Sequence, residues 1–165
     1  MLPDIKRILY ATDMGQNSIH AFRYAVQMVK LTGAEIHILH VVEQLSNYAV
    51  VTLQIYVMDA TKRREILEQR IKRAEDALKA RQDEFWAGQD EATQPLRQQV
   101  KSMIVRESYP AEEILKTVKR ENCDLIIMGG HEKGMSHTFL GGVAKSVLRR
   151  SRVPTMIVPL PEEED

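Results

Sequence analysis

Residues 125–148 read LIIMGGHEKGMSHTFLGGVAKSVL, and this stretch decides the fold. An apolar run, Leu125–Met128, stops at a first glycine pair and gives way to a polar loop that itself contains glycine. A second pair, Gly141-Gly142, opens a segment with helical spacing. Glycines serve turns more often than ligands. Here, however, a buried strand, a loop and a glycine-rich helix start would direct backbone N–H groups and the positive helix end toward one point. The pattern therefore predicts a strand–loop–helix unit suited to an anion.

Short apolar runs alternate with helical patterns on both sides of this stretch. Alternating strands and helices predict an α/β fold, a doubly wound parallel sheet with helices on both faces. Strands are expected at Ile5–Tyr10, Glu35–Val42, Val100–Val105, Asp124–Met128 and Val153–Val158. Helices are expected from a cap at Asn17 or Ser18 to Gly33, at Thr61–Trp86, from Pro110 onward, and at Val143–Arg150.

The middle of the chain is less regular. Ser46–Ala60 mixes apolar and polar residues without a clear period, so the sequence predicts a loop there. Thr61–Trp86 carries many charges and one apolar side. Such a seam is compatible with a coiled coil, but the outer helix of a crossover lying on the sheet is the favoured interpretation.

Composition limits the classes of function. A chain of 165 residues predicts one domain over 1–165, with 161–165 as an acidic, mobile tail. Lys plus Arg and Asp plus Glu are both 23, so no net charge favours nucleic acid or an anionic membrane. No apolar run has the length of a membrane span, and Met1–Arg7 lacks a signal-peptide core. The lone Cys123 predicts a small core residue in a reducing compartment. We therefore expect a soluble, cytoplasmic protein.

With these elements in place, the chain resembles the universal stress protein family over nearly its whole length. The resemblance rests on five segments in the right order: Lys6–Asp13, Ala34–Val42, Pro110–Ile114, Cys123–Gly129 and Val153–Pro159. It implies a single Rossmann-like domain with a five-stranded parallel sheet in the order 3-2-1-4-5. It also implies a homodimer formed by antiparallel pairing of Val153–Val158, which would otherwise be an exposed sheet edge.

Some family members bind ATP and others do not, and the resemblance leaves both outcomes open for this chain. The binding pattern of the family is glycine, two residues, glycine, nine residues, then glycine followed by Ser or Thr. Gly129 and Gly141 match its first and third glycines, but the connection is one residue shorter. Glu132 replaces the second glycine, and Gly142 stands where a hydroxyl would bind phosphate. The phosphate half is therefore altered, which favours weaker triphosphate binding or fewer phosphates.

The base and ribose half of the family site is retained. Asp13 matches an acidic residue near the nucleotide, although it can instead satisfy local amides at a helix start. His131 can approach a phosphate or be a solvated loop residue. The implied adenine-nucleotide site consists of Ala11, Thr12, Asp13, Val41, Met128, Gly129, His131, Gly141, Gly142, Val143 and Ala144.

Other residue types give no competing site. His37 and His40 lie three apart on a strand, so they point to opposite faces and cannot chelate one metal. The sequence has no Ser/His/Asp set or P-loop lysine at the required spacing, and catalysis is not expected. The leading hypothesis is a dimeric, regulatory stress-response protein with a partly degenerate site for ATP, ADP or AMP. The alternatives are an interaction module without nucleotide, acting through its dimer surface, and a slow ATPase using His131.

Overall fold

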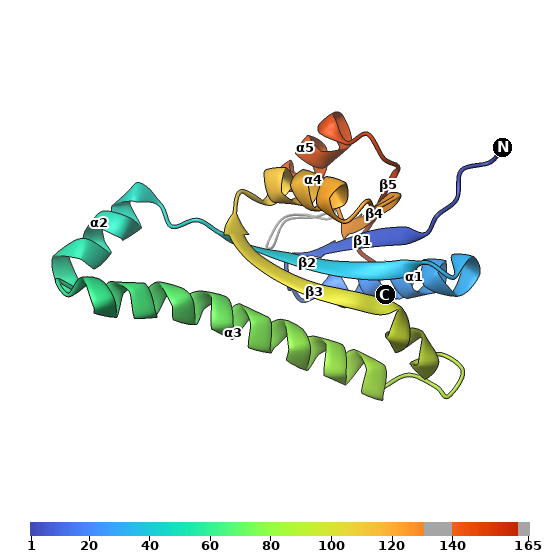
Figure 1. Ribbon diagram of the computed structural model, residues 1–165, viewed down its shortest axis with the longest axis horizontal. Coiled ribbons are helices and arrows are strands. Elements are labelled where there is room, and N and C mark those ends of the chain that lie inside the picture. The colour runs from blue at the N-terminus through green and yellow to red at the C-terminus, as the bar shows by residue number, and fades with distance from the viewer. Residues whose placement is uncertain (131–139, 162–165) are drawn as a thin grey trace.

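The sheet is five-stranded and parallel. In the computed structural model, which describes residues 1–130 and 140–161, the strands lie in the order β3-β2-β1-β4-β5 (Figure 1). This confirms the predicted fold class and strand order. The strands are β1 (Arg7–Thr12), β2 (Glu35–Glu43), β3 (Val100–Ser108), β4 (Leu125–Gly129) and β5 (Thr155–Val158).

Helices cover both faces of the sheet because strand side chains alternate in direction. Ile8 and Tyr10 of β1 point into a core shared with α1 (Ser18–Thr32) and the end of α3 (Ala60–Ala87). Leu9 and Ala11 point the other way, into a core shared with α4 (Pro110–Arg120) and α5 (Gly142–Arg150). The crossover between β2 and β3 also contains α2 (Asn47–Tyr56) and a short 3-10 helix, η1 (Gln94–Gln99).

The signals for helix ends are only partly realised. Gly33 ends α1 in the left-handed conformation, at φ 73°, and Pro110 begins α4. Asn17 is the N-cap residue of α1, but its side chain makes no capping bond. Ser18 instead donates from its hydroxyl to the Gly15 carbonyl at 2.8 Å. The start of α1 is therefore held by its preceding loop rather than by a side-chain cap.

The predicted loop at Ser46–Ala60 is wrong for most of its length. Asn47–Tyr56 forms α2, and the Ser46 side chain caps it by accepting from the Ala49 N–H at 3.1 Å. Asp59 caps α3 in the same way, accepting from the Thr61 N–H at 2.9 Å. None of the residues of α2 is buried.

The long helix α3 runs along the sheet beside β2 and β3, as the crossover interpretation predicted (Figure 1). Leu78, Phe85 and Trp86 are buried in the core with Phe22 of α1. Within the helix, ion pairs join Lys72 to Asp76 and Lys79 to Asp83.

Strand bounds differ by one to three residues. β1 begins two residues later than predicted, because its pairing with β2 runs from Arg7 opposite Glu35 to Thr12 opposite His40. β5 begins at Thr155, after a turn in which the Ser151 hydroxyl contacts Val153. The acidic residues 162–165 of the predicted tail lie outside the described residues. Over residues 1–130 and 140–161, no helix combines the length and the apolar character that crossing a membrane requires.

We predict that Cys123 is unreactive in the native protein. The residue is 5% exposed, and burial, with smaller contributions from Glu121 and Asp124, raises the pKa of its thiol to about 12. Since the thiolate is the reactive species, little of it exists at pH 8. A chromogenic disulfide reagent should therefore react fully in urea but very slowly without it. Rapid native labelling would show that the site opens.

Candidate functional site

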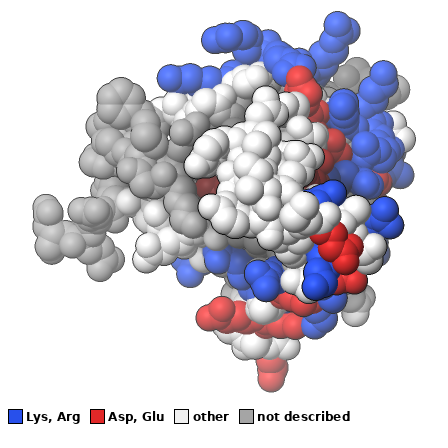
Figure 2. Space-filling view, turned by 90° about the vertical axis from the view of Figure 1, so that its left-hand side faces the viewer, with Lys and Arg blue, Asp and Glu red and all other residues white. Residues whose placement is uncertain are grey.

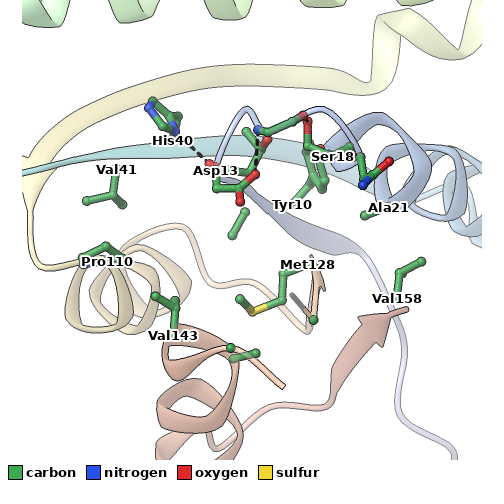
Figure 3. A pocket seen from close by; sticks show the side chains of 18 of the residues that line it. Tyr10, Asp13, Ser18, Ala21, His40, Val41, Pro110, Met128, Val143 and Val158 are labelled. Carbon is green, nitrogen blue, oxygen red and sulfur yellow. Dashed lines mark hydrogen bonds between the residues drawn. The ribbon is translucent and has the colours of Figure 1, made fainter. Parts of the chain in front are cut away.

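A cavity of about 700 Å³ opens at the carboxyl ends of the strands. Its volume is within the range of small-molecule sites, about 300–1,000 Å³. The β1–α1 loop forms one side, and the starts of α4 and α5 form the other (Figure 3). The central strand β1 is flanked by β2 and β4, and the chain turns to opposite faces of the sheet after β1 and β4. Doubly wound folds bind ligands at this switch point.

The β1–α1 loop is fixed by its own side chains. The Met14 N–H donates to Thr12 Oγ1 at 2.9 Å, and the Gly15 N–H donates to Asp13 Oδ1 at 2.7 Å. Met14 has a positive φ of 55°, so the chain bends sharply at this point. His40 of β2 donates from Nδ1 to the Thr12 carbonyl at 2.8 Å, which ties the loop to the next strand (Figure 3).

Asp13 therefore accepts from a local amide, as the sequence analysis proposed as the alternative to a nucleotide role. One carboxylate oxygen, Oδ1, accepts from Gly15, and the exposed residue also lines the cavity. The turn fixes the direction of the carboxylate at the cavity rim. A ligand role for Asp13 stays a prediction.

Gly130 and Gly141, which flank the loop after β4, lie close together. The Gly130 N–H donates to the Val158 carbonyl at 3.2 Å, and the Gly141 N–H donates to the Gly130 carbonyl at 2.7 Å. Gly141 is the N-cap residue of α5 and has no side chain to cap it. The positive end of α5 therefore borders the cavity, where Gly141, Val143 and Ala144 are part of the wall.

The structure brings most of the predicted site residues to this cavity. Nine of them line it: Ala11, Thr12, Asp13, Val41, Met128, Gly129, Gly141, Val143 and Ala144. Gly142, the first residue of α5, is not among the lining residues. His131, Glu132 and Lys133 lie outside the described residues.

Several lining residues were not predicted. Pro110 and Ile114 come from α4, Glu43 extends from the end of β2, and Pro159 and Leu160 follow β5. The sequence marked Pro110 only as a helix start. The signal that could have found it is topological, because β3 ends at the same edge of a parallel sheet as β1 and β4, so the start of α4 must lie there too.

The charged side chains in the described lining of the cavity are not those typical of an anion site. It contains the carboxylates of Asp13 and Glu43 and the imidazoles of His20 and His40, but no Lys or Arg. Backbone amides and the positive end of α5 are its electropositive groups. Within the part of the chain that the structure describes, no group of three His, Cys, Asp or Glu is placed to hold a metal ion.

We predict that Arg81 positions the β1–α1 loop. From α3, its Nη2 donates to the Gly15 carbonyl at 2.7 Å and to Ser18 Oγ at 2.8 Å. The hydroxyl of the buried Tyr10 also holds this loop, because it donates to the Ser18 carbonyl at 2.7 Å. Arg81→Met keeps the aliphatic stem but removes both bonds, and should lower the free energy of unfolding by about 1–2 kcal/mol.

Urea unfolding and amide exchange of Gly15 and Ser18 measure this effect. Arg73→Met on the exposed side of the same helix is the matched control and should change stability by less than about 0.5 kcal/mol. Equal effects of the two substitutions, with unchanged loop exchange, would contradict the positioning role.

Comparisons with known proteins agree with this architecture. The model of the universal stress protein family matches residues 4–159. The chain is 27% identical to universal stress protein MJ0577 of Methanocaldococcus jannaschii over 157 residues, covering 93% of this chain and 94% of that protein. The structure of universal stress protein UspA from Lactobacillus plantarum has a TM-score of 0.70 at 19% identity, covering 95% of this chain and 99% of that one. A universal stress protein solved in complex with cAMP has a TM-score of 0.53 at 17% identity, with 96% and 100% covered.

Proposed function

The chain belongs to the universal stress protein family, and from that premise we propose that it binds an adenine nucleotide in the cavity at the carboxyl ends of β1, β2 and β4. The observation that carries the proposal is the position of the α5 N-terminus beside a cavity of about 700 Å³ at the switch point of the sheet. The relative solved with cAMP supports an adenine nucleotide as the ligand class.

The two halves of the cavity favour different parts of such a ligand. Val41, Ile114 and Met128 offer apolar surface for a base. Gly129, Gly141 and Val143 lie around the α5 N-terminus, where helix amides can meet a phosphate. We assign Asp13, which also lines the cavity, to the ribose hydroxyls.

The number of phosphates is limited by charge. Two carboxylates line the cavity, and its described lining has no Lys or Arg. Each added phosphate brings further negative charge to a cavity with two carboxylates, whereas a helix end supplies only about half a positive unit charge. We therefore expect AMP and ADP to bind at least as tightly as ATP in the absence of a divalent cation.

Two measurements test the proposal. Acid denaturation of the purified protein, followed by mass analysis of the released small molecules, should yield an adenine nucleotide. Calorimetric titration of the stripped protein with AMP, ADP and ATP should give saturable binding in the micromolar range, with ATP not preferred. Clean extracts together with flat titrations would refute nucleotide binding and leave a nucleotide-free interaction module as the better account.

The edge of the sheet at β5 supports a homodimer. β5 is an edge strand that pairs only with β4 among the described residues, so its free edge is available to a second copy. We infer a regulatory, cytoplasmic homodimer joined at β5 that works by binding rather than by turnover. Replacing Thr155 by Pro would remove its N–H and place a ring at this edge, and should lower the mass measured by light scattering.

A further inference from the structure

The helix α2 exposes apolar surface that the rest of the chain leaves uncovered. Its ten residues, NYAVVTLQIY, carry no charge, and none of them is buried. The helix lies away from the sheet, at the end of the molecule where the chain turns back into α3 (Figure 1). Helices of this length are marginal in water and gain most of their stability from packing an apolar face. A helix this apolar is normally covered.

The uncovered side chains form a stripe. Tyr48, Val51 and Ile55 are spaced i, i+3 and i+7 on one side of α2 and are 82%, 51% and 64% exposed. Tyr56 and Met58, next to them in the chain, are 83% and 87% exposed. Figure 2, seen from the end where α2 lies, shows an uncharged patch at the centre with charged side chains above it, below it and to its right.

The size of the stripe is in the range of an interface. An aromatic side chain covers about 150–250 Å², so these five residues together expose on the order of 600 Å². Monomers rarely leave a larger continuous apolar patch than this, whereas a stable dimer covers about 800 Å² on each partner.

We propose that the α2 stripe pairs with the α2 stripe of a second copy of this chain. An apolar stripe with 3–4 spacing is self-complementary when two helices pack antiparallel about a two-fold axis. Val51, at its centre, would then lie opposite the partner's Val51. The stripe has no charge to repel its own copy, and the whole chain has equal numbers of acidic and basic residues. β5, at the far edge of the sheet from β3, is a separate surface, so the two pairings do not compete.

Cysteine cross-linking tests the pairing directly. Cys123 is buried, so Val51→Cys would add an accessible thiol of its own. Under oxidised glutathione, the full-length variant should form mostly disulfide-linked dimer on a non-reducing gel. Glu68→Cys, at an exposed position on α3, is the matched control and should remain monomeric on the gel. Equal cross-linking of both variants, or none of Val51→Cys, would overturn the proposal.

A second variant separates this interface from that at β5 and from other occupants. Val51→Lys/Ile55→Lys should raise the dissociation constant of the α2 pairing by about a hundredfold or more, because an unpaired ammonium would be buried. Sedimentation should show that the mass falls from that of the unsubstituted chain to that of the dimer joined at β5. An unchanged mass would contradict the pairing. Cosedimentation with phosphatidylcholine vesicles, lost in the same variant while the mass stays unchanged, would assign the stripe to a lipid surface instead.

Discussion

Replacing Val143 by Asp is expected to weaken binding of AMP or ADP by about a hundredfold. Val143 lies in the first turn of α5 and lines the cavity. Two unit charges about 6 Å apart repel by about 3 kcal/mol at an effective dielectric constant of about 20, which corresponds to roughly that factor in affinity. The new carboxylate would also compete with the nucleotide for the positive end of the helix.

Val143→Asn is the matched control, because asparagine has the shape of aspartate without its charge. It should retain most of the affinity of the unsubstituted chain, as measured by calorimetry. A loss of stability would not explain weaker binding by Val143→Asp, since an acidic residue in the first turn stabilises a helix by about 0.3–1 kcal/mol. We therefore expect Val143→Asp to unfold at slightly higher urea concentration than Val143→Asn while binding far less nucleotide. Equal affinities of the two variants would place the phosphate elsewhere.

Replacing Gly130 by Ala is expected to lower the free energy of unfolding by about 1–3 kcal/mol through overpacking. A Cβ atom at this position would lie 2.7 Å from Ile157 Cγ2 and 3.3 Å from Leu140 Cδ1. Ile157 packs in the core beneath α4 and α5, and its branched side chain has little freedom to move aside. A shift of Gly130 would also disturb the bond that its carbonyl accepts from Gly141 at 2.7 Å.

The adjacent glycine is the control for this substitution. A Cβ at Gly129 would meet no atom of the described chain within 4 Å, and neither glycine has a positive φ. Gly129→Ala should therefore change stability by less than about 0.5 kcal/mol, even though both residues line the cavity. Urea unfolding of the pair measures the difference. Two equal losses of stability would mean that the loop requires glycine for a reason other than space.

Local sequence signals located the sheet because its strands are buried. Ile126 and Ile127 of β4 are fully buried, and a run of such residues predicts a central strand without further information. The ends of strands were less accurate. β3 continues to Ser108 because it pairs with β2 up to Glu43, and the exposed polar residues of that extension carry no apolar signal.

The missed helix α2 has the opposite cause. Periodicity detects a helix by the contrast between an apolar and a polar face, whereas in α2 the apolar Val50 and Leu53 lie off the stripe of exposed residues. The signal that was present was local: Ser46 and Asp59 are N-cap residues of α2 and α3.

The residues of the candidate site that could be predicted are those at the carboxyl ends of the strands. Thr12, Val41 and Met128 were chosen by family resemblance, and parallel pairing brings the ends of their three strands to one edge. Glu43 and Pro110 were missed because they bear no local mark of a ligand site. Arg81 was missed because it reaches the loop from another element, 66 residues away in sequence from Gly15.

The central claim is that an adenine nucleotide occupies this cavity, and nuclear magnetic resonance of the backbone amides tests it most directly. On addition of AMP to the ¹⁵N-labelled full-length protein, we expect the largest shifts at Val41, Gly129, Val143 and Ala144, with saturation at one ligand per chain. Spectra that do not change, or shifts confined to α2 and the exposed face of α3, would contradict the claim.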